Sequence, residues 1–470
     1  MCGVVGVHAP GQDVARLATL GLFALQHRGQ ESAGLAVSDG RGVMVYKDLG
    51  LIDQVLDERR LQSLRGDLAI AHCRYSTTGS TIWENSQPTL RMGPLRTVAV
   101  GHNGNLVNTA QLLEELPGGR SRLVGTTDTE LLTALLAVEP GADLVEALLR
   151  LLPRVSGAYS LVIMDETRVV GVRDPYGFRP LVLGVLPTAD GRAWCLASET
   201  AALDSLGADF VRDVEPGEMV VLGEPDGPRS VRFAEGREQL CVFELIYFAR
   251  PDSYMLGRNL YEARRRMGEM LAREAPAEAD LVMPVPDTGA PAAAGYAEAS
   301  GIPYREGMVR NRYAGRTFIQ PNDGMRQRGV TVKLSALREQ VRGRRLVVVD
   351  DSIVRGTTTR QIVGLLRRAG AREIHVRISA PPIFHPCFYG IDTQIETELI
   401  AASRPVDEIR QFIDADSLSY LSIGGVLDAI DLPRERFCFA CFDGQYPVPV
   451  PYDPGNRKFL LEREEAVVAR

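Results

Sequence analysis

The residues best suited to chemistry in the second half of the chain lie in VVVDDSIVRGTTT, residues 347–359. An apolar run over 346–349 predicts a strand buried on both faces of a parallel sheet. Asp350 and Asp351 follow at its carboxyl end, where open α/β sheets bind ligands and where paired carboxylates can accept hydrogen bonds from neighbouring sugar hydroxyls. The turn and helix start that come next offer hydroxyl and free N–H groups that suit a phosphate: Ser352, Arg355, Gly356, Thr357 and Thr358.

The amino end offers a nucleophile of a different kind. The chain begins Met1-Cys2-Gly3, and a small second residue normally allows the initiator methionine to be removed. Cys2 would then carry a thiol beside its own α-amine, whose usual pKa of about 7.7–8.0 suits a general base at neutral pH. A cysteine at this position usually has no chemical role, so this interpretation depends on the motifs that follow.

Four such motifs lie within the first 130 residues. HRGQES supplies Arg28, and HCRYSTTG places Arg74 at a predicted strand end. HNGN supplies the side-chain amide of Asn103 and the backbone N–H of Gly104, which are two donors suited to an oxyanion. TTDTE opens a predicted helix with Asp128 near its cap, where ordinary helix capping is an alternative role.

Cys2 and these motifs, in this order, resemble the N-terminal-nucleophile glutamine amidotransferases. The resemblance implies that the Cys2 thiolate attacks the side-chain amide of glutamine while Asn103 and Gly104 hold the oxyanion. It also implies that Arg74 grips the substrate carboxylate, that Asp128 holds the substrate α-ammonium and that Arg28 supports the site.

The stretch 347–359 resembles the signature of type I phosphoribosyltransferases, which bind phosphoribosyl pyrophosphate. MPVPDTG, residues 283–289, adds Asp287 and Thr288, and the resemblance implies that Thr288 joins Asp350 and Asp351 at a magnesium site. A buried strand before a threonine-capped helix, and a proline-bounded turn at 283–289, are the plain structural alternatives. The arginine-rich segment 310–330 would fold over phosphorylated ligands, and Arg312 and Lys333 would contact the anionic groups of those ligands.

Seven cysteines are present, and disulfides are improbable in an intracellular chain of this size. Cys73 and Cys195 are expected to be packed core thiols. The other four resemble the ligands of a structural 4Fe-4S cluster found in one branch of the amidophosphoribosyltransferases, with zinc as the runner-up and empty thiols as the plain alternative: Cys241, Cys387, Cys438 and Cys441.

The expected elements give two domains and a tail: residues 2–235, 240–450 and 451–470. The fold class is α/β and α+β, with an αββα glutaminase sandwich followed by a parallel α/β phosphoribosyltransferase sheet. A boundary is predicted between residues 223 and 239, where proline and glycine are dense. HNGN is expected to follow a strand over 97–101, and CVFELIYFARPDS, residues 241–253, to carry an aromatic-rich strand into a turn.

Composition limits the classes of function. The chain has 470 residues and a net charge of −7, which argues against a general binder of nucleic acid or of membrane surfaces. No signal peptide or apolar run long enough to span a membrane is evident, so a cytoplasmic location is expected. Only three of the 53 basic residues are lysines, so arginine is the habitual cation.

The resemblance extends from Cys2 to about Asp443 and is to the amidophosphoribosyltransferases. It implies glutamine-dependent conversion of phosphoribosyl pyrophosphate to 5-phosphoribosylamine in purine synthesis, with ammonia passing between two sites. It further implies feedback inhibition by purine nucleotides and a homo-oligomer, a tetramer. The competing hypotheses are another N-terminal-cysteine amidotransferase, for which the acceptor domain is wrong, and a phosphoribosyl-pyrophosphate-sensing regulator.

Overall fold

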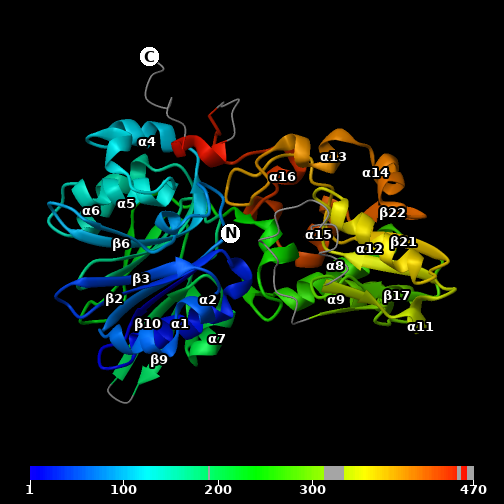
Figure 1. Ribbon diagram of the computed structural model, residues 1–470, viewed down its shortest axis with the longest axis horizontal. Coiled ribbons are helices and arrows are strands. Elements are labelled where there is room, and N and C mark those ends of the chain that lie inside the picture. The colour runs from blue at the N-terminus through cyan, green and yellow to red at the C-terminus, as the bar shows by residue number, and fades with distance from the viewer. Residues whose placement is uncertain (189–190, 312–332, 452–456, 463–470) are drawn as a thin grey trace.

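The structure is a computed structural model that describes residues 1–188, 191–311, 333–451 and 457–462. These residues form two lobes, on the left and right of Figure 1, with the amino end between them. No helix among the described residues has the length and apolar character needed to cross a membrane.

The first lobe contains two antiparallel sheets. In the seven-stranded sheet the order is β11 (Asp209–Asp213), β9 (Val182–Thr188), β10 (Gly191–Ala197), β1 (Gly3–His8), β4 (Leu68–Arg74), β2 (Ser32–Ser38) and β3 (Val43–Leu49). In the six-stranded sheet it is β13 (Arg229–Arg232), β12 (Glu218–Leu222), β8 (Val169–Arg173), β7 (Gly157–Met164), β6 (Thr97–Leu106) and β5 (Thr89–Met92).

Three apolar layers hold this lobe together. Side chains such as Val4, Ile70 and Val162 fill the space between the two sheets. The outer face of the first sheet is covered mainly by α1 (Val14–Ala24) and α7 (Thr200–Leu206), and that of the second by α4 (Thr109–Glu115), α5 (Asp128–Val138) and α6 (Leu144–Leu151). Two short helices, α2 (Ile52–Val55) and α3 (Glu58–Ser63), flank the first sheet. The layers are therefore those of the predicted αββα sandwich.

The second lobe is built on a parallel four-stranded sheet in the order β17 (Leu281–Pro284), β20 (Arg345–Asp350), β21 (Glu373–Ile378) and β22 (Ser417–Tyr420). Val347–Val349 are completely or almost completely buried, as the apolar run predicts. The larger helices of this lobe are α8 (Leu260–Glu274), α9 (Ala290–Ser300), α12 (Thr357–Arg368), α14 (Val406–Ile413) and α15 (Ile423–Ile430). The predicted fold class is confirmed for both lobes.

Smaller elements complete the second lobe. A hairpin-like pair joins β18 (Met308–Arg310) to β19 (Leu334–Ala336), and β15 (Tyr254–Met255) pairs with β16 (Arg258–Asn259). Near the end of the chain β23 (Phe437–Cys438) returns to pair in parallel with β14 (Leu240–Cys241) at the start of the lobe. Short α-helices of this lobe are α11 (Arg338–Val341), α13 (Ile400–Ser403) and α16 (Ala440–Asp443), and the 3₁₀ segment Arg457–Glu462 packs on the first lobe.

Two predictions about elements need correction. HNGN does not follow a strand: it lies inside β6, where its residues pair with β7. The aromatic stretch after Cys241 is not a strand but a π-helical turn, Glu244–Phe248, whose apolar side chains Leu245 and Ile246 are buried in the core of the second lobe. The predicted boundary segment, residues 223–239, contains β13, which extends the second sheet of the first lobe, and ends just before β14.

Candidate active sites

Cys2 lies just before β1, where the two lobes meet, and only 5% of its surface is exposed. Its backbone nitrogen lies 3.1 Å from the side-chain oxygen of Asn103 on β6, and its Sγ lies 3.6 Å from the carbonyl oxygen of Tyr75. The Asn103 Nδ2 amide is buried and has no hydrogen-bond partner among the described residues. An unpaired buried donor beside a thiol is what stabilisation of an oxyanion requires.

Gly104 is held beside Asn103 by close packing of β6 on β7. A Cβ atom at this position would lie 2.0 Å from the carbonyl oxygen of Ala158, so no side chain fits. The backbone N–H of His102 donates to Gln87 Oε1 (2.8 Å), and the Gln87 amide donates to Thr129 Oγ1 (3.0 Å). This buried network fixes the strand that presents both proposed oxyanion donors.

Arg74, at the end of β4, and Asp128, at the start of α5, are both buried. The Arg74 guanidinium donates to the carbonyl oxygens of Thr78 (2.9 Å) and Ser80 (3.2 Å) and lies 3.7 Å from Glu31. Arg74 therefore organises the loop after β4. Asp128 opens α5 and accepts from the backbone N–H of Leu106 (3.0 Å), whereas the helix is capped by Thr127.

Arg28 is fully buried behind the nucleophile. Its Nε donates to the carbonyl oxygen of Cys2 (2.9 Å), and its terminal nitrogens bind Glu199 (2.5 Å) and Glu244 (2.8 and 3.0 Å). Although burial disfavours the guanidinium charge, the two carboxylates raise the pKa of Arg28. No sequence motif pointed to Glu199 or Glu244, because the apolar residues around each of them predict only a buried core segment.

Met1 occupies a buried position beside this cluster, and its side-chain sulfur contacts the Arg179 guanidinium. Burial lowers the pKa of the Met1 ammonium to about 6. The Met1 amine is thus held towards the neutral form, which is the form that accepts a proton.

The second candidate site lies at the carboxyl ends of β17 and β20. Thr288 Oγ1 donates to one oxygen of Asp351, and Ser352 Oγ donates to the other (2.7 Å). Burial and the charge of Asp351 raise the pKa of Asp350, and burial raises the pKa of Asp351. Such a carboxylate pair favours a cation, which offsets the cost of burying two like charges.

The helix start beside this pair has the predicted form. Gly356 caps α12 with φ +73°, a left-handed conformation that favours glycine, and Thr357 and Thr358 are exposed in its first turn. Arg355 pairs with Glu398, and Asp287 lies 3.0 Å from Arg310. The carbonyl oxygen of Lys333 accepts from the backbone N–H of Asn311 (2.8 Å). The predicted contact Arg312 lies outside the described residues.

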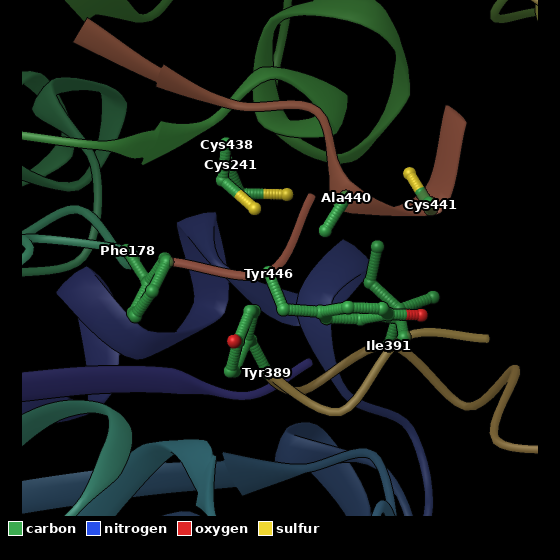
Figure 2. Close-up of a pocket in the computed structure, with 9 residues that line it drawn as sticks. Phe178, Cys241, Tyr389, Ile391, Cys438, Ala440, Cys441 and Tyr446 are labelled. Carbon is green, nitrogen blue, oxygen red and sulfur yellow. The ribbon is translucent and has the colours of Figure 1, made fainter. Parts of the chain in front are cut away.

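The structure brings the four predicted cluster cysteines together. Cys241, Cys387, Cys438 and Cys441 are buried and line one cavity, together with Phe178, Tyr389, Ile391, Ala440 and Tyr446. Figure 2 shows Cys241 and Cys438 side by side, on the paired strands β14 and β23, with Cys441 on the next turn of the chain. Within the described residues, no group of three or more His, Cys, Asp or Glu side chains is arranged to hold a single metal ion.

The donor chemistry of this cavity is that of thiols in apolar and aromatic surroundings. Burial raises the pKa of Cys241 to about 11 and holds the pKa values of Cys438 and Cys441 well above the ordinary thiol value. All seven cysteines are free, and Cys73 and Cys195 lie in the apolar core of the first lobe, as expected.

The segment that carries Cys387 also contacts the first candidate site. The Asn105 amide donates to the carbonyl oxygen of Phe388 (3.0 Å), and the Gln394 amide donates to the carbonyl oxygen of Thr77 (2.9 Å). Between these contacts, Gly390 lies against the backbone of Gly104. The cysteine cavity is thereby linked through one loop to the strand that presents the proposed oxyanion donors.

The carboxyl-terminal segment Arg457–Glu462 contacts two loops. Glu462 binds the loop after β4, and Lys458 binds the loop over residues 387–394. Glu462 accepts from the backbone N–H and the hydroxyl of Ser80 (both 2.7 Å), and Leu461 is buried in the core of the second sheet. Lys458 pairs with Asp392 at 3.0 Å. No sequence motif pointed to this contact, since the segment follows the last recognisable element by many residues.

Family models match two parts of the chain: a glutamine amidotransferase domain over residues 72–205 and a phosphoribosyl transferase domain over residues 254–381. The chain is 52% identical to the amidophosphoribosyltransferase of Mycobacterium tuberculosis, with 100% of this chain and 90% of the relative covered. It is also 52% identical to that of Synechococcus elongatus, with 98% and 94% covered.

Two solved structures are similar to this chain over nearly its whole length. A structure described as the allosteric regulatory enzyme of purine biosynthesis shares 46% identity with a TM-score of 0.90, covering 98% of this chain and 99% of the other. The glutamine phosphoribosylpyrophosphate amidotransferase of Bacillus subtilis, complexed with ADP and GMP, shares 45% identity with a TM-score of 0.89, covering 98% and 100%.

Proposed function

Because this chain belongs to the amidophosphoribosyltransferase family, we propose a division of labour between its two lobes in the first committed step of purine biosynthesis. The first lobe releases ammonia from glutamine at Cys2, and the second uses it to convert phosphoribosyl pyrophosphate to 5-phosphoribosylamine and pyrophosphate. The observation that carries this proposal is the contact between the Cys2 nitrogen and Asn103, whose amide Nδ2 has no partner among the described residues.

At the first site, removal of Met1 would turn the nitrogen now 3.1 Å from Asn103 Oδ1 into a free amine. That amine takes the proton of the Cys2 thiol, and the thiolate attacks the side-chain carbonyl carbon of glutamine. Asn103 Nδ2 and the Gly104 N–H stabilise the oxyanion, and ammonia leaves with the proton. Water then hydrolyses the thioester to glutamate. Arg74 and Asp128 hold the substrate carboxylate and α-ammonium.

At the second site, ammonia attacks C1 of the ribose and the bond from C1 to the pyrophosphate oxygen breaks, with inversion. Asp350 and Asp351 accept hydrogen bonds from the ribose hydroxyls, and the α12 start binds the 5-phosphate through backbone N–H groups. A magnesium ion, which Thr288, Asp350 and Asp351 would help to hold, supplies charge neutralisation for the leaving pyrophosphate. The lobe otherwise contributes positioning, with Asp287, Arg312 and Lys333 as further substrate contacts.

The four cysteines that line one cavity support a structural 4Fe-4S cluster in this chain. Soft thiolate donors spread around a cavity suit a cluster whose irons occupy separate corners. A tetrahedral zinc ion, the runner-up, needs all four sulfurs about 2.3 Å from one point. Since burial raises the pKa of Cys241, cluster binding would displace thiol protons. Iron and acid-labile sulfide analysis of anaerobically purified protein tests this assignment, and stoichiometric zinc would overturn it.

Three further properties belong to the same proposal. The Bacillus subtilis relative was solved with ADP and GMP, which supports feedback inhibition of this chain by purine nucleotides. The exposed apolar side chains of α1, such as Leu20 and Phe23, are compatible with a homo-oligomer, which we propose to be a tetramer. Free cysteines throughout agree with a cytoplasmic location.

The Cys2→Ala variant tests the division of labour. We expect it to lose synthesis of phosphoribosylamine from glutamine but to retain synthesis from added ammonium salts at neutral to alkaline pH, because the second site is untouched. In the wild type, phosphoribosyl pyrophosphate should accelerate glutamine hydrolysis. Loss of both routes in a well-folded variant, or survival of both, would refute the proposal.

A further inference from the structure

A carboxylate of the second lobe lies directly behind the nucleophile of the first. Glu244 belongs to the π-helical turn Glu244–Phe248 and is fully buried. Its two side-chain oxygens bind both terminal nitrogens of Arg28, at 2.8 and 3.0 Å. This is the bidentate geometry in which a carboxylate fixes a guanidinium most firmly.

Arg28 in turn contacts the nucleophilic residue. Its remaining nitrogen, Nε, donates to the carbonyl oxygen of Cys2 at 2.9 Å. Three partners thereby fix the plane of the guanidinium. The Cys2 carbonyl binds Nε, Glu244 binds both terminal nitrogens, and Glu199 of the first lobe lies 2.5 Å from Nη1. A shift of Glu244 would rotate this plane and carry the Cys2 carbonyl with it.

The charges around Glu244 are closely balanced. Arg179 lies 3.3 Å from Glu244 and also donates to the carbonyl oxygen of Tyr389. Glu199 is further bound by His27 at 2.7 Å and by the hydroxyl of Ser253 at 2.8 Å. Two buried arginines thus face two buried glutamates, and removal of one carboxylate leaves a buried guanidinium without its main partner.

We propose that Glu244 is a positioning residue for glutamine hydrolysis: through Arg28 it fixes the backbone of Cys2 relative to Asn103 and Gly104. The inference rests on the proposed function of Cys2 and extends it across the lobe boundary, since the first lobe depends on a carboxylate that it does not itself contain. Glu244 touches neither substrate nor reacting atoms and acts only through Arg28.

The test is Glu244→Gln, which keeps the shape of the side chain and removes its charge. We expect kcat for glutamine-dependent synthesis to fall at least tenfold, while ammonia-dependent synthesis in the same preparation stays within twofold. A general structural defect of the second lobe would lower both rates. Glu238→Gln is the matched control: Glu238 also bridges the lobes, through Arg436 and Arg173, but makes no contact with Arg28.

A double-mutant comparison separates positioning from general damage. If Glu244 acts through Arg28, Glu244→Gln should lower glutamine-dependent kcat by less than twofold in an Arg28→Lys background. Equal effects in both backgrounds, equal loss of both synthetic rates, or unchanged glutamine-dependent kcat would each overturn the inference. Should Glu244→Gln not fold, Glu244→Asp replaces it, with the same expected selectivity for the glutamine-dependent rate.

The two proposals fail in different ways. If the processed wild-type protein hydrolyses no glutamine, the proposed function of Cys2 is wrong and the role of Glu244 falls with it. If the wild type is active and Glu244→Gln matches Glu238→Gln, only the role of Glu244 is wrong.

Discussion

At the scale of single residues, both sites depend on polar groups that are buried and incompletely satisfied. Asn103 Nδ2 is buried without a partner among the described residues, and Asp350 and Asp351 are two carboxyls placed side by side. Each arrangement costs stability in the resting protein and is offset only when substrate or metal arrives. These costs make the single residues testable.

For Asn103, we expect Asn103→Ala to lower kcat for glutamine hydrolysis by about 10²–10³-fold, because one of two oxyanion donors is lost. Steady-state kinetics with glutamine, compared with ammonium chloride as nitrogen source, measures the effect. The ammonia-dependent rate is the internal control and should stay near the wild-type value. An equally active Asn103→Ala variant would exclude this amide as an oxyanion donor.

For Asp350, the expected effect is on stability as a function of pH. Burial and the charge of Asp351 raise the pKa of Asp350 in the folded protein. A carboxyl whose folded-state pKa is raised contributes stability at low pH and loses it as the pH rises through that value. Without magnesium, the free energy of unfolding of Asp350→Asn should therefore be higher than that of the wild type near pH 8.

This stability difference should shrink as the pH falls below about 3, where the carboxyl is mostly protonated in the unfolded chain as well as in the folded protein. Denaturant unfolding of both proteins at the two pH values measures it. The same variant should lose synthesis from both glutamine and ammonia. A stability gain that is identical at the two pH values would show that ionisation of Asp350 is not its cause.

At the scale of elements, the loop over residues 387–394 connects the cysteine cavity with the glutaminase strand. A Cβ atom at Gly390 would lie 3.2 Å from the carbonyl carbon of Gly104 and 3.3 Å from Arg179 Nε. The loop therefore packs directly against β6 at Gly104, whose backbone N–H is a proposed oxyanion donor. A side chain at Gly390 should displace either the loop or the strand.

We expect Gly390→Ala to lower glutamine-dependent synthesis about tenfold, because a displacement of β6 misaligns the Gly104 N–H. Gly301→Ala is the matched control. Gly301 also has a positive φ, +71° against +108° at Gly390, but an added Cβ would meet nothing within 4 Å. Both variants pay a backbone cost of about 1–2 kcal/mol, so Gly301→Ala controls for that cost, and only Gly390→Ala should lose glutamine-dependent rate. Matching activities would show that the loop does not position β6.

The elements also show where sequence patterns suffice and where they fail. The run over 346–349 predicted β20 because four apolar residues in a row can only be buried on both faces. HNGN was placed after a strand because its polar residues suggest a loop, yet β6 continues through them, since buried partners take up most of their polar groups and leave Asn103 Nδ2 unpaired among the described residues. The stretch after Cys241 has the composition of a strand, but it forms a π-helical turn whose apolar side chains lie in the core of the second lobe.

At the scale of the whole molecule, the two lobes are joined by contacts that neither could form alone. The Arg28–Glu244 pair and the hydrogen bonds of Asn105 to Phe388 and of Gln394 to Thr77 cross this junction, and the cysteine cavity is lined from both lobes. Sequence motifs predicted individual site residues because each motif is local. The junction itself was not predictable, because its partners lie far apart in the chain, by 216 residues for Arg28 and Glu244 and by 317 for Thr77 and Gln394.

We expect Cys438→Ser to lower the iron content and the thermal unfolding temperature together, because metal binding free energy contributes to folding. Cys195→Ser is the control. Cys195 is a buried thiol in the core of the first lobe, outside the cavity, so its loss should cost about 1–3 kcal/mol of stability without changing the iron content. Differential scanning calorimetry and iron analysis on the same samples measure both quantities. Full iron content in Cys438→Ser would remove this thiol from the ligand set.

The scarcity of lysine has a practical consequence. The Lys47 amine donates to the carbonyl oxygen of Ser86, near the loop after β4. Lys458, in the segment Arg457–Glu462, pairs with Asp392. Lys333 is the third lysine, beside the segment that leads to the phosphoribosyl site. Amine-reactive dyes would therefore attach to only a few side chains. With one of these lysines exchanged for arginine, two lysine side chains remain, and a fluorophore pair attached to them reports the distance between the segments that carry them.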